Sequence, residues 1–220
     1  MSAKSPEQGM TRRTFLRIGV GAMGALALGG AGVKAAMWAP TPALARDTMG
    51  DSMRKVLVTY ATKSGSVTDI AERIGAKLAE AGAHVDVKPV QDAPDAAGYD
   101  AVILGSGVRV GNWHGAAKSW LTSSANALRS KPVAFFTVGL TITDASKADE
   151  VRAYTDPLIK ETGVQPTDVG LFAGWFVPKK FSLLERTIMK AMKAPEGDHR
   201  DFAAVDAWAA KTAQPLGVVA

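Results

Sequence analysis

The stretch VLVTYATKSGSVTDI, residues 56–70, decides the fold of this 220-residue chain. It opens with an apolar run typical of a buried strand and passes through a polar turn that holds one glycine. It then enters a segment whose apolar residues Ile70, Ile74 and Leu78 recur at helical spacing. Ser66 and Asp69 have the spacing of a capping box, which predicts a helix start beside Ser66. A strand that leads directly into an amphipathic helix indicates a strand–helix–strand unit on a parallel sheet.

Further strands follow along the chain. Near-continuous apolar runs are expected of strands that helices cover on both faces, and they stand at residues 101–104, 133–138 and 169–177. The run at 84–90 instead alternates apolar and charged residues and contains Pro89. Because proline cannot donate to a neighbouring strand, we expect this run at the edge of the sheet.

Helical spacing between these runs completes the fold prediction. Helices are expected near residues 116–128, 148–162 and 202–211. We therefore expect an α/β domain over residues 54–215, with a doubly wound five-stranded parallel sheet in the order 2-1-3-4-5 and helices on both faces.

The first 45 residues have the layout of a cleavable signal peptide. Paired arginines stand in TRRTFL at 11–16, a Gly- and Ala-rich apolar stretch follows at 18–33, and ALA ends the segment at 43–45. This resembles the twin-arginine type, whose translocase carries prefolded proteins. We expect a linker at 46–53 and export to the periplasm or the outer face of the cytoplasmic membrane. An uncleaved N-terminal anchor is the alternative.

Charge and cysteine content exclude several function classes. The formal net charge is +5, but the first 45 residues hold five basic residues and one acidic residue, so the rest is close to balance. A nucleic-acid partner is therefore not expected. The chain has no cysteine, so redox chemistry would need a bound cofactor. His84 and His199 show no metal-ligand spacing, and we expect no metal site.

The turn after the first strand has the chemistry of an anion site. It places hydroxyls, a glycine and backbone N–H groups at a helix N-terminus. The spacing of a nucleotide-triphosphate P-loop is missing, so a monophosphate fits better, and an ordinary polar turn is the alternative. The predicted phosphate-binding residues are Thr62, Lys63, Ser64, Gly65, Ser66, Val67 and Thr68.

A family resemblance rests on this turn. YATKSGS at 60–66 resembles the phosphate loop of flavodoxins, commonly T-x-T-G-x-T, and the elements of the mature chain are collinear with that family. The final threonine of the pattern falls on Val67, with Thr68 one place later. The resemblance implies a flavodoxin-like fold and FMN as the cofactor.

The loop after the third strand, GSGVRVGNWH at 105–114, is expected to hold the flavin ring. Its glycines allow close backbone approach, and Trp113 offers a flat surface for stacking or is a core residue. Arg109 and His114 are the catalytic candidates. Arg109 could pair with a substrate carboxylate or with negative charge on reduced flavin. His114 could instead merely begin a helix. The predicted ring-binding residues are Ser106, Gly107, Val108, Arg109, Gly111, Asn112, Trp113, Gly139, Leu140 and Thr141.

A narrower resemblance comes from the R-x-G-x-aromatic-His run at 109–114, which is similar to bacterial quinone-dependent protoporphyrinogen IX dehydrogenases. A basic amphipathic insertion at 178–195 agrees with it. The resemblance implies an FMN-dependent oxidoreductase that exchanges reducing equivalents between a small or porphyrin-like substrate and a quinone. The alternatives are an exported flavodoxin-type electron carrier and a flavin-free binding module of the same fold.

The insertion also predicts a partner surface. Within 179–193, Leu184, Ile188 and Met192 recur every four residues while lysines and an arginine flank them. Such a segment can lie in a membrane interface, so we expect peripheral membrane contact. Packing against its own domain or a second subunit is the alternative.

The leader supplies a first test. Replacing Arg12 and Arg13 together by lysine should trap the protein in the cytoplasm, because the twin-arginine translocase recognises the arginine pair. Cell fractionation followed by immunoblotting measures the distribution. Normal export of the double-lysine variant would contradict the twin-arginine prediction.

Overall fold

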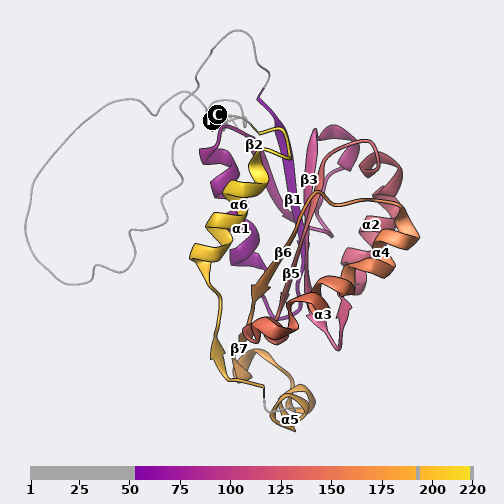
Figure 1. Ribbon diagram of the computed structural model, residues 1–220. Coiled ribbons are helices and arrows are strands. Elements are labelled where there is room, and N and C mark those ends of the chain that lie inside the picture. The colour runs from indigo at the N-terminus through magenta and orange to yellow at the C-terminus, as the bar shows by residue number, and fades with distance from the viewer. Residues whose placement is uncertain (1–52, 192–193, 219–220) are drawn as a thin grey trace, which may run out of the picture. The chain divides into compact units, whose positions relative to one another are not determined.

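Five parallel strands form the centre of the structure, a computed structural model that describes residues 53–191 and 194–218. Their order is β2-β1-β3-β5-β6, and a short strand, β4, pairs antiparallel with β3 (Figure 1). The strands of this sheet are β1 (Lys55–Ala61), β2 (His84–Pro89), β3 (Ala101–Arg109), β4 (Asn112–Trp113), β5 (Val133–Gly139) and β6 (Val169–Ala173). The predicted order and the edge position of β2 are confirmed.

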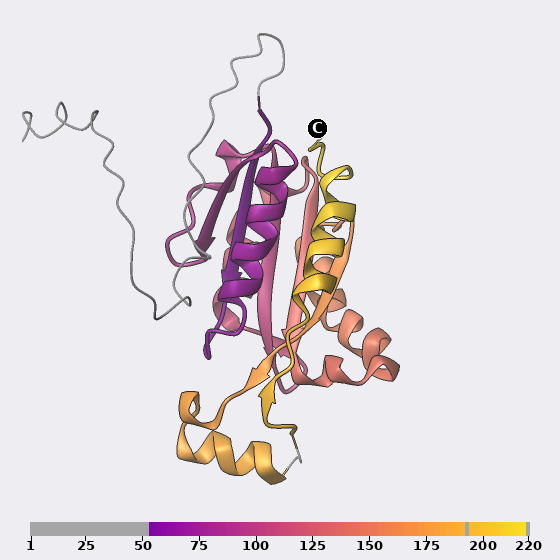
Figure 2. The same ribbon diagram turned by 90° about the vertical axis from the view of Figure 1, so that its left-hand side faces the viewer.

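Helices cover both faces of this sheet. In Figures 1 and 2, α1 and α6 lie side by side on one face, and Figure 1 shows α2, α3 and α4 on the other. The α-helices are α1 (Thr68–Glu80), α2 (Gly115–Leu128), α3 (Ala148–Arg152), α4 (Asp156–Thr162), α5 (Leu183–Ala191) and α6 (Phe202–Ala213). Short 3-10 helices are η1 (Ala96–Gly98), η2 (Leu140–Thr143), η3 (Ala145–Lys147), η4 (Ala153–Thr155) and η5 (Pro178–Lys180).

Strand β1 feeds two separate hydrophobic cores. Val56 and Val58 pack with α1 and α6, whereas Leu57 packs with α2 and α4 on the opposite face. Successive side chains of a strand point to opposite faces, so an unbroken apolar run is what a doubly covered strand requires. On the α1 side, Ile70 and Ile74 are fully buried, as their helical spacing predicts.

The parallel register aligns the carboxyl ends of the strands. Ala61 of β1 lies opposite Ser106 of β3, and Gly107 of β3 lies opposite Val138 of β5. The loops that follow β1, β3, β5 and β6 therefore emerge at one edge of the sheet, where open α/β sheets bind their ligands.

The predicted capping box is wrong. Helix α1 starts at Thr68, and its N-cap is Val67, which makes no side-chain cap. A turn closed by the Thr68 N–H and the Gly65 carbonyl precedes the helix, so Ser66 lies outside it. The Asp69 carboxylate instead forms an ion pair with Arg200, a residue distant in sequence.

Two predicted elements are interrupted. The expected strand at 169–177 leaves the main sheet at Gly174, and the next residues form β7 (Trp175–Phe176), which pairs with β8 (Gly197–Asp198) in a second small sheet. Gly174 packs closely at this point, since a Cβ atom there would lie 3.3 Å from Val138 Cγ1. The expected helix at 148–162 breaks into α3, η4 and α4, because Pro157 at the start of α4 interrupts the helical ladder.

The two strands of this second sheet connect the insertion to the rest of the domain. Figure 2 shows β7 and β8 leading away from the main sheet to α5. Met192 and Lys193, like the predicted signal peptide at 1–45 and nearly all of the linker at 46–53, lie outside the described residues. Within the described ranges, none of the helices has the length and apolar character needed to cross a membrane.

Close packing at Gly105 gives a stability test. A methyl group at Gly105 would overlap the ring of Phe136, which is fully buried. Gly105→Ala should therefore lower the free energy of unfolding by about 1–3 kcal/mol, measured by urea denaturation. Gly98→Ala is the matched control, since no atom lies within 4 Å of its Cβ position, and it should change stability by less than about 0.5 kcal/mol. Equal stability of the two variants would contradict the packing argument.

Candidate functional site

A cavity of about 600 Å³ lies at the carboxyl edge of the main sheet. The loops after β1, β3, β5 and β6 line one part of it, and the insertion lines another. The predicted site residues that line this cavity are Thr62, Lys63, Ser64, Ser66, Gly107, Val108, Arg109, Gly111, His114, Gly139, Leu140 and Thr141. The three loops singled out from the sequence thus converge, while contact of each residue with FMN stays a prediction.

Other predicted residues shape the cavity without lining it; they are Gly65, Val67, Thr68, Ser106, Asn112 and Trp113. Gly65 has a φ of +86°, a left-handed conformation, and its N–H donates to Thr62 Oγ1 at 3.0 Å. This tight turn carries the chain from β1 to α1. Val67 is fully buried in the core, so the position at which the flavodoxin pattern has a threonine serves packing here.

The loop after β3 is a tight hairpin. Val108 pairs with Trp113 and Arg109 with Asn112, so Val110 and Gly111 form the turn. Both turn residues have positive φ, at 49° and 70°, which is strained for a β-branched valine. The Val110 side chain is 91% exposed and lines the cavity, so the strained tip offers an apolar surface there.

The predicted stacking role of Trp113 is wrong. Its side chain is only 3% exposed, its Nε1 donates to Thr137 Oγ1 at 3.0 Å, and its ring packs edge-on against Phe135. The core reading of this residue therefore holds. Ser106 is buried as well, and its hydroxyl accepts the backbone N–H of His114. These contacts fix the base of the hairpin.

His114 begins helix α2 and also faces the cavity. Its Nδ1 accepts the backbone N–H of Ala116 at 3.2 Å, which makes it the N-cap. The sequence left open whether His114 is a catalytic candidate or only a helix start. The structure gives it the helix start and a place in the cavity lining.

The sequence missed Trp175, which follows the bend at Gly174 and lines the cavity. Lys180 Nζ lies 4.0 Å and Arg200 Cζ 4.2 Å from the ring centroid. The Cζ2 edge of the indole lies 3.5 Å from the Cβ position at Gly65, beside the predicted phosphate loop. Trp175 lies within an apolar run that predicts one continuous strand, so no feature of the sequence indicated that this residue leaves the main sheet.

Arg200 ties the insertion to the domain. Its side chain is 8% exposed and pairs with Asp69 of α1 and with Asp198 of β8. The hydrogen bond from Arg200 holds the pKa of Asp198 below its ordinary value. A buried arginine with two carboxylates and two aromatic neighbours makes an anchor that resists displacement.

Glu185 of α5 is the second residue that the sequence missed. Its carboxylate accepts hydrogen bonds from Lys63 Nζ at 2.7 Å and Arg109 Nη2 at 2.6 Å. The backbone N–H of Ser182 donates to its other oxygen at 2.9 Å. The hydrogen bond from Lys63, and after it the one from Arg109, hold the pKa of the Glu185 carboxyl far below its usual range. An ionised carboxylate from the insertion therefore joins the two predicted loops.

The remaining lining of the insertion is largely apolar. Phe181, Ile188 and Met189 face the cavity together with Pro195. The cavity thus has a polar side, formed by the loop at 62–66, and an apolar side, formed by the insertion. Glu150 of α3 and Tyr154 of η4 also line the cavity, and the Tyr154 hydroxyl donates to Glu150.

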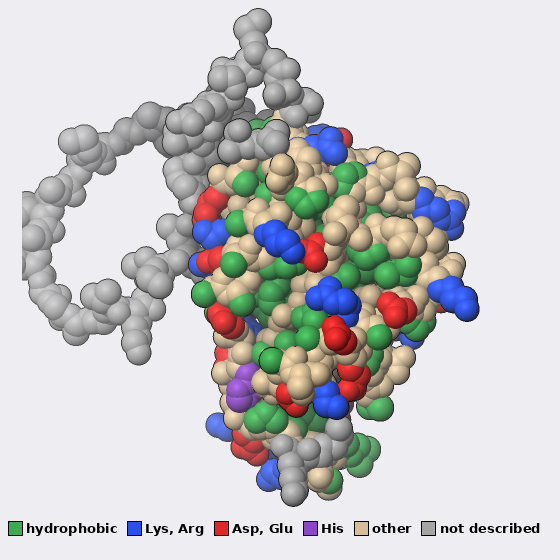
Figure 3. Space-filling view, viewed as in Figure 1, with side chains coloured by type: hydrophobic (Ala, Val, Ile, Leu, Met, Phe, Trp, Pro, Cys, Tyr) green, Lys and Arg blue, Asp and Glu red, His purple; other side chains and the backbone are tan. Residues whose placement is uncertain are grey.

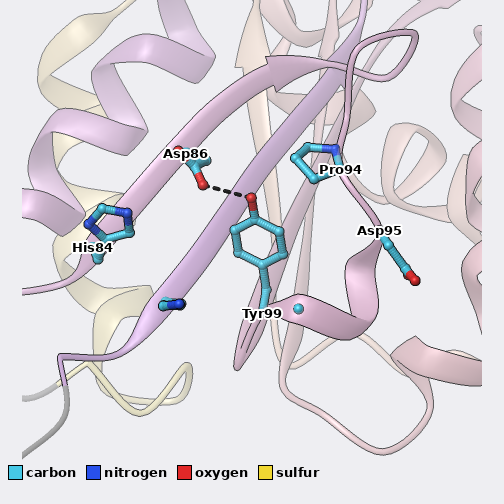
Figure 4. Close-up of a pocket in the computed structure, with 7 residues that line it drawn as sticks. His84, Asp86, Pro94, Asp95 and Tyr99 are labelled. Carbon is cyan, nitrogen blue, oxygen red and sulfur yellow. Dashed lines mark hydrogen bonds between the residues drawn. The ribbon is translucent and has the colours of Figure 1, made fainter.

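A second hollow, of about 450 Å³, lies by the amino ends of β1 and β2 (Figure 4). Figure 4 shows the Tyr99 hydroxyl pointing at Asp86, to which it donates at 2.6 Å. Burial and this carboxylate raise the pKa of Tyr99 to about 12. The hollow lies away from the carboxyl edge, and its one carboxylate–phenol pair is already satisfied. Among the described residues, no cluster of histidine and acidic side chains could hold a metal ion.

A family model described as the flavodoxin domain matches residues 57–202. The chain belongs to this family. FMN is the cofactor of flavodoxins, so the cofactor predicted from the sequence agrees with the family.

Two relatives share a name. The protoporphyrinogen IX dehydrogenase (quinone) of Escherichia coli strain K12 is 25% identical over 67% of this chain and 83% of its own length. That of Leishmania major is 29% identical over 77% of this chain and 80% of its own length.

Among solved structures, Flavodoxin 2 from Bacillus cereus is 22% identical, with a TM-score of 0.49 over 73% of this chain and 98% of its own. An archaeal flavodoxin is 16% identical, also with a TM-score of 0.49, over 74% of this chain and 99% of its own.

Trp175 tests whether the residues present fit FMN. Its Nε1 is buried, and no group in the described part of the chain accepts a hydrogen bond from it. A buried donor without an acceptor costs about 1–3 kcal/mol. The Cζ2 edge of this indole lies 3.5 Å from the Cβ position of Gly65, so the unpaired donor stands beside the loop at 62–66, whose hydroxyls and backbone N–H groups suit a phosphate. The residues therefore fit the phosphate end of FMN.

The phosphate loop supplies a binding test. Ser64→Asp should weaken FMN binding at least about tenfold, because a carboxylate would face a phosphate of like charge. Quenching of FMN fluorescence on titration with protein measures the affinity. Ser64→Ala removes the hydroxyl without adding charge and should cost less. Wild-type affinity in Ser64→Asp would show that the phosphate binds elsewhere.

Proposed function

We propose that this chain is an FMN-dependent oxidoreductase that exchanges reducing equivalents between a small or porphyrin-like substrate and a quinone. The observation that carries the proposal is the insertion, whose apolar side chains face the same cavity as the loops predicted to bind the flavin. A protein that only hands electrons to a partner protein needs no such wall. A wall of Phe181, Ile188 and Met189 suits an apolar substrate that must lie close to the flavin.

The residues divide the work in a way that supports this proposal. The loop at 62–66 and Trp175 would hold the phosphate, and the hairpin tip at Val110 would border the ring. When bound, FMN supplies the transfer of two electrons between substrate and acceptor. The substrate would lose two electrons and two protons, and the quinone would gain both and become a quinol. Arg109 would steady negative charge near the ring or on the substrate.

The names of the relatives support the acceptor. Both are called quinone-linked protoporphyrinogen IX dehydrogenases, and they align with 67% and 77% of this chain. We extend to this chain the quinone and a porphyrin-like substrate. An electron carrier of the flavodoxin type is the second candidate, which the family itself favours.

Export and membrane contact belong to the same proposal. We infer that the twin-arginine translocase delivers the folded domain to the periplasm or the outer face of the cytoplasmic membrane. Leu183 and Leu184 of α5 are 78% and 72% exposed, and neither lines the cavity. In Figure 3, the lower end of the molecule carries hydrophobic and charged side chains together.

This surface suits an anionic lipid membrane. The exposed Lys179, Lys180 and Lys190 lie on the same insertion as the two leucines. Each lysine near anionic lipid is worth about 1 kcal/mol, and the leucines add apolar burial. A membrane at this place would bring its quinones near the apolar side of the cavity.

Reoxidation of the reduced protein tests the function. The FMN of the purified full chain is reduced anaerobically with dithionite and then mixed with a water-soluble short-chain quinone. We expect oxidised flavin absorption to return, because the cavity would admit the quinone to the ring. A protein whose flavin is reoxidised by ferricyanide but not by quinone would be a carrier. A protein that takes no FMN would be a flavin-free module, and either result would overturn the proposal.

Membrane docking has its own variant, Leu183→Ser combined with Leu184→Ser. It should lower partition onto anionic vesicles at least about tenfold, since two exposed leucines no longer enter the interface. Reoxidation by long-chain quinone in those vesicles should fall in parallel, while reoxidation by the water-soluble quinone stays normal. Met53→Ser, which removes an exposed apolar residue before β1, is the control. Unchanged vesicle binding by the double variant would exclude docking through α5.

A further inference from the structure

The carboxylate of Glu185 lies between two cations that belong to different loops. Lys63 follows β1, Arg109 ends β3, and Glu185 comes from α5 of the insertion. Lys63 and Arg109 are 58% and 44% exposed as side chains, whereas Glu185 is only 19% exposed. All three line the cavity. The two cations therefore meet on a carboxylate that faces the cavity.

An ammonium group and a guanidinium group that converge on one carboxylate form the usual recognition site for an anionic ligand. The carboxylate that such a pair of cations binds can belong to a ligand instead of to the protein. Glu150, which also lines the cavity, is satisfied by close neighbours, since it pairs with Lys147 and accepts from Tyr154. Glu185, which also accepts the backbone N–H of Ser182, pairs instead with cations that belong to two other loops.

The ion pairs that Glu185 makes with the two cations are exchangeable. None of the side chains of α5 is buried, so the helix has no core of its own to fix it. Lys63 and Arg109 are both about half exposed, so water and salt compete with Glu185 for these cations and limit what the ion pairs contribute to stability. A ligand that brings its own carboxylate could therefore take the place of Glu185 at small cost.

We propose that Lys63 and Arg109 form a carboxylate-binding subsite of the cavity, which Glu185 fills until a carboxylate-bearing substrate exchanges with it. This inference rests on the proposed function in one respect, that the cavity admits a substrate. On exchange, the ligand carboxylate pairs with Lys63 and Arg109, and Glu185 with α5 is released from the loops. The subsite thus selects organic acids and couples their binding to movement of the insertion.

The phosphate of FMN is the competing anion for these cations. Lys63 belongs to the phosphate loop by sequence, but its Nζ extends to α5, whereas the loop keeps Thr62, Ser64 and Ser66 at the cavity. The phosphate and carboxylate subsites are therefore separate in this proposal. Protein loaded with FMN should still bind a carboxylate at Lys63 and Arg109.

Calorimetric titration with succinate tests the subsite in the full chain, both FMN-loaded and FMN-free. Glu185→Gln keeps the side-chain shape and removes the competing charge. It should bind succinate about tenfold more tightly than wild type, because wild type must first give up the ion pairs of Glu185 with Lys63 and Arg109. Adding Arg109→Gln to this variant should abolish the gain. Succinamide, which has no charge, should bind neither protein.

Glu80→Gln is the control for net charge. Glu80 pairs with Lys77 at the far end of α1, so its loss should leave succinate affinity unchanged. Hydrogen exchange gives a second readout: amides of α5 should exchange faster in Glu185→Gln, and in wild type when succinate is added.

Three results would overturn the proposal. They are equal succinate affinity in wild type and Glu185→Gln, a gain that survives Arg109→Gln, and a gain that disappears on FMN loading. The last would assign the cations to the cofactor phosphate. Failure to bind FMN would sink the proposed function alone, because the FMN-free titration still decides whether the subsite exists.

Discussion

Parallel pairing of β1 with β3 places the site, since the loops on either side can meet only if these strands end together. Their register sets Tyr60 opposite Gly105 and Ala61 opposite Ser106. The phosphate loop and the arginine-bearing hairpin consequently leave the sheet at the same edge. Gly105 makes this arrangement possible, because the ring of Phe136 occupies the space that any side chain there would need. Packing on one face of the sheet thus fixes the position of the loops at its end.

The insertion is held by a different set of forces. Arg200 anchors its base through two carboxylates and the ring of Trp175, and the Arg200 side chain itself is only 8% exposed. Its helix α5 is held by Glu185 through ion pairs whose two cations, Lys63 and Arg109, remain about half exposed to solvent. A firm base and a weakly held tip are what a movable cover needs, because motion at the tip then does not disturb the core. The family fold would account for the cofactor, and the insertion would account for the choice of substrate.

This division explains how one domain could combine a polar cofactor with an apolar reaction partner. The phosphate end of a flavin needs hydroxyls, backbone N–H groups and a tight left-handed turn, which the loop around Gly65 provides. A quinone or a porphyrin-like ring needs apolar contacts, which the loop does not have and which Phe181, Ile188 and Met189 of the insertion supply. Neither part makes the cavity alone.

The sequence by itself predicted the fold class and the strand order, because apolar runs and helical spacing are local and Pro89 favours an edge strand, and the resemblance of the loop at 60–66 to the flavodoxin phosphate loop predicted the family. It also located the loops at 62–68, 105–114 and 139–141, since a loop that follows a parallel strand must lie at the carboxyl edge. Only the tertiary structure decided which side chains face the cavity. Trp113 and Val67 turned into the core because the hairpin and the helix start direct them there. Glu185 entered the site through its ion pair with Arg109, 76 positions away, and Trp175 through its contact with Arg200 of the segment after the insertion. Trp175 also lies against Gly65 of the predicted phosphate loop. No periodicity within one segment can reveal contacts between residues so distant in sequence.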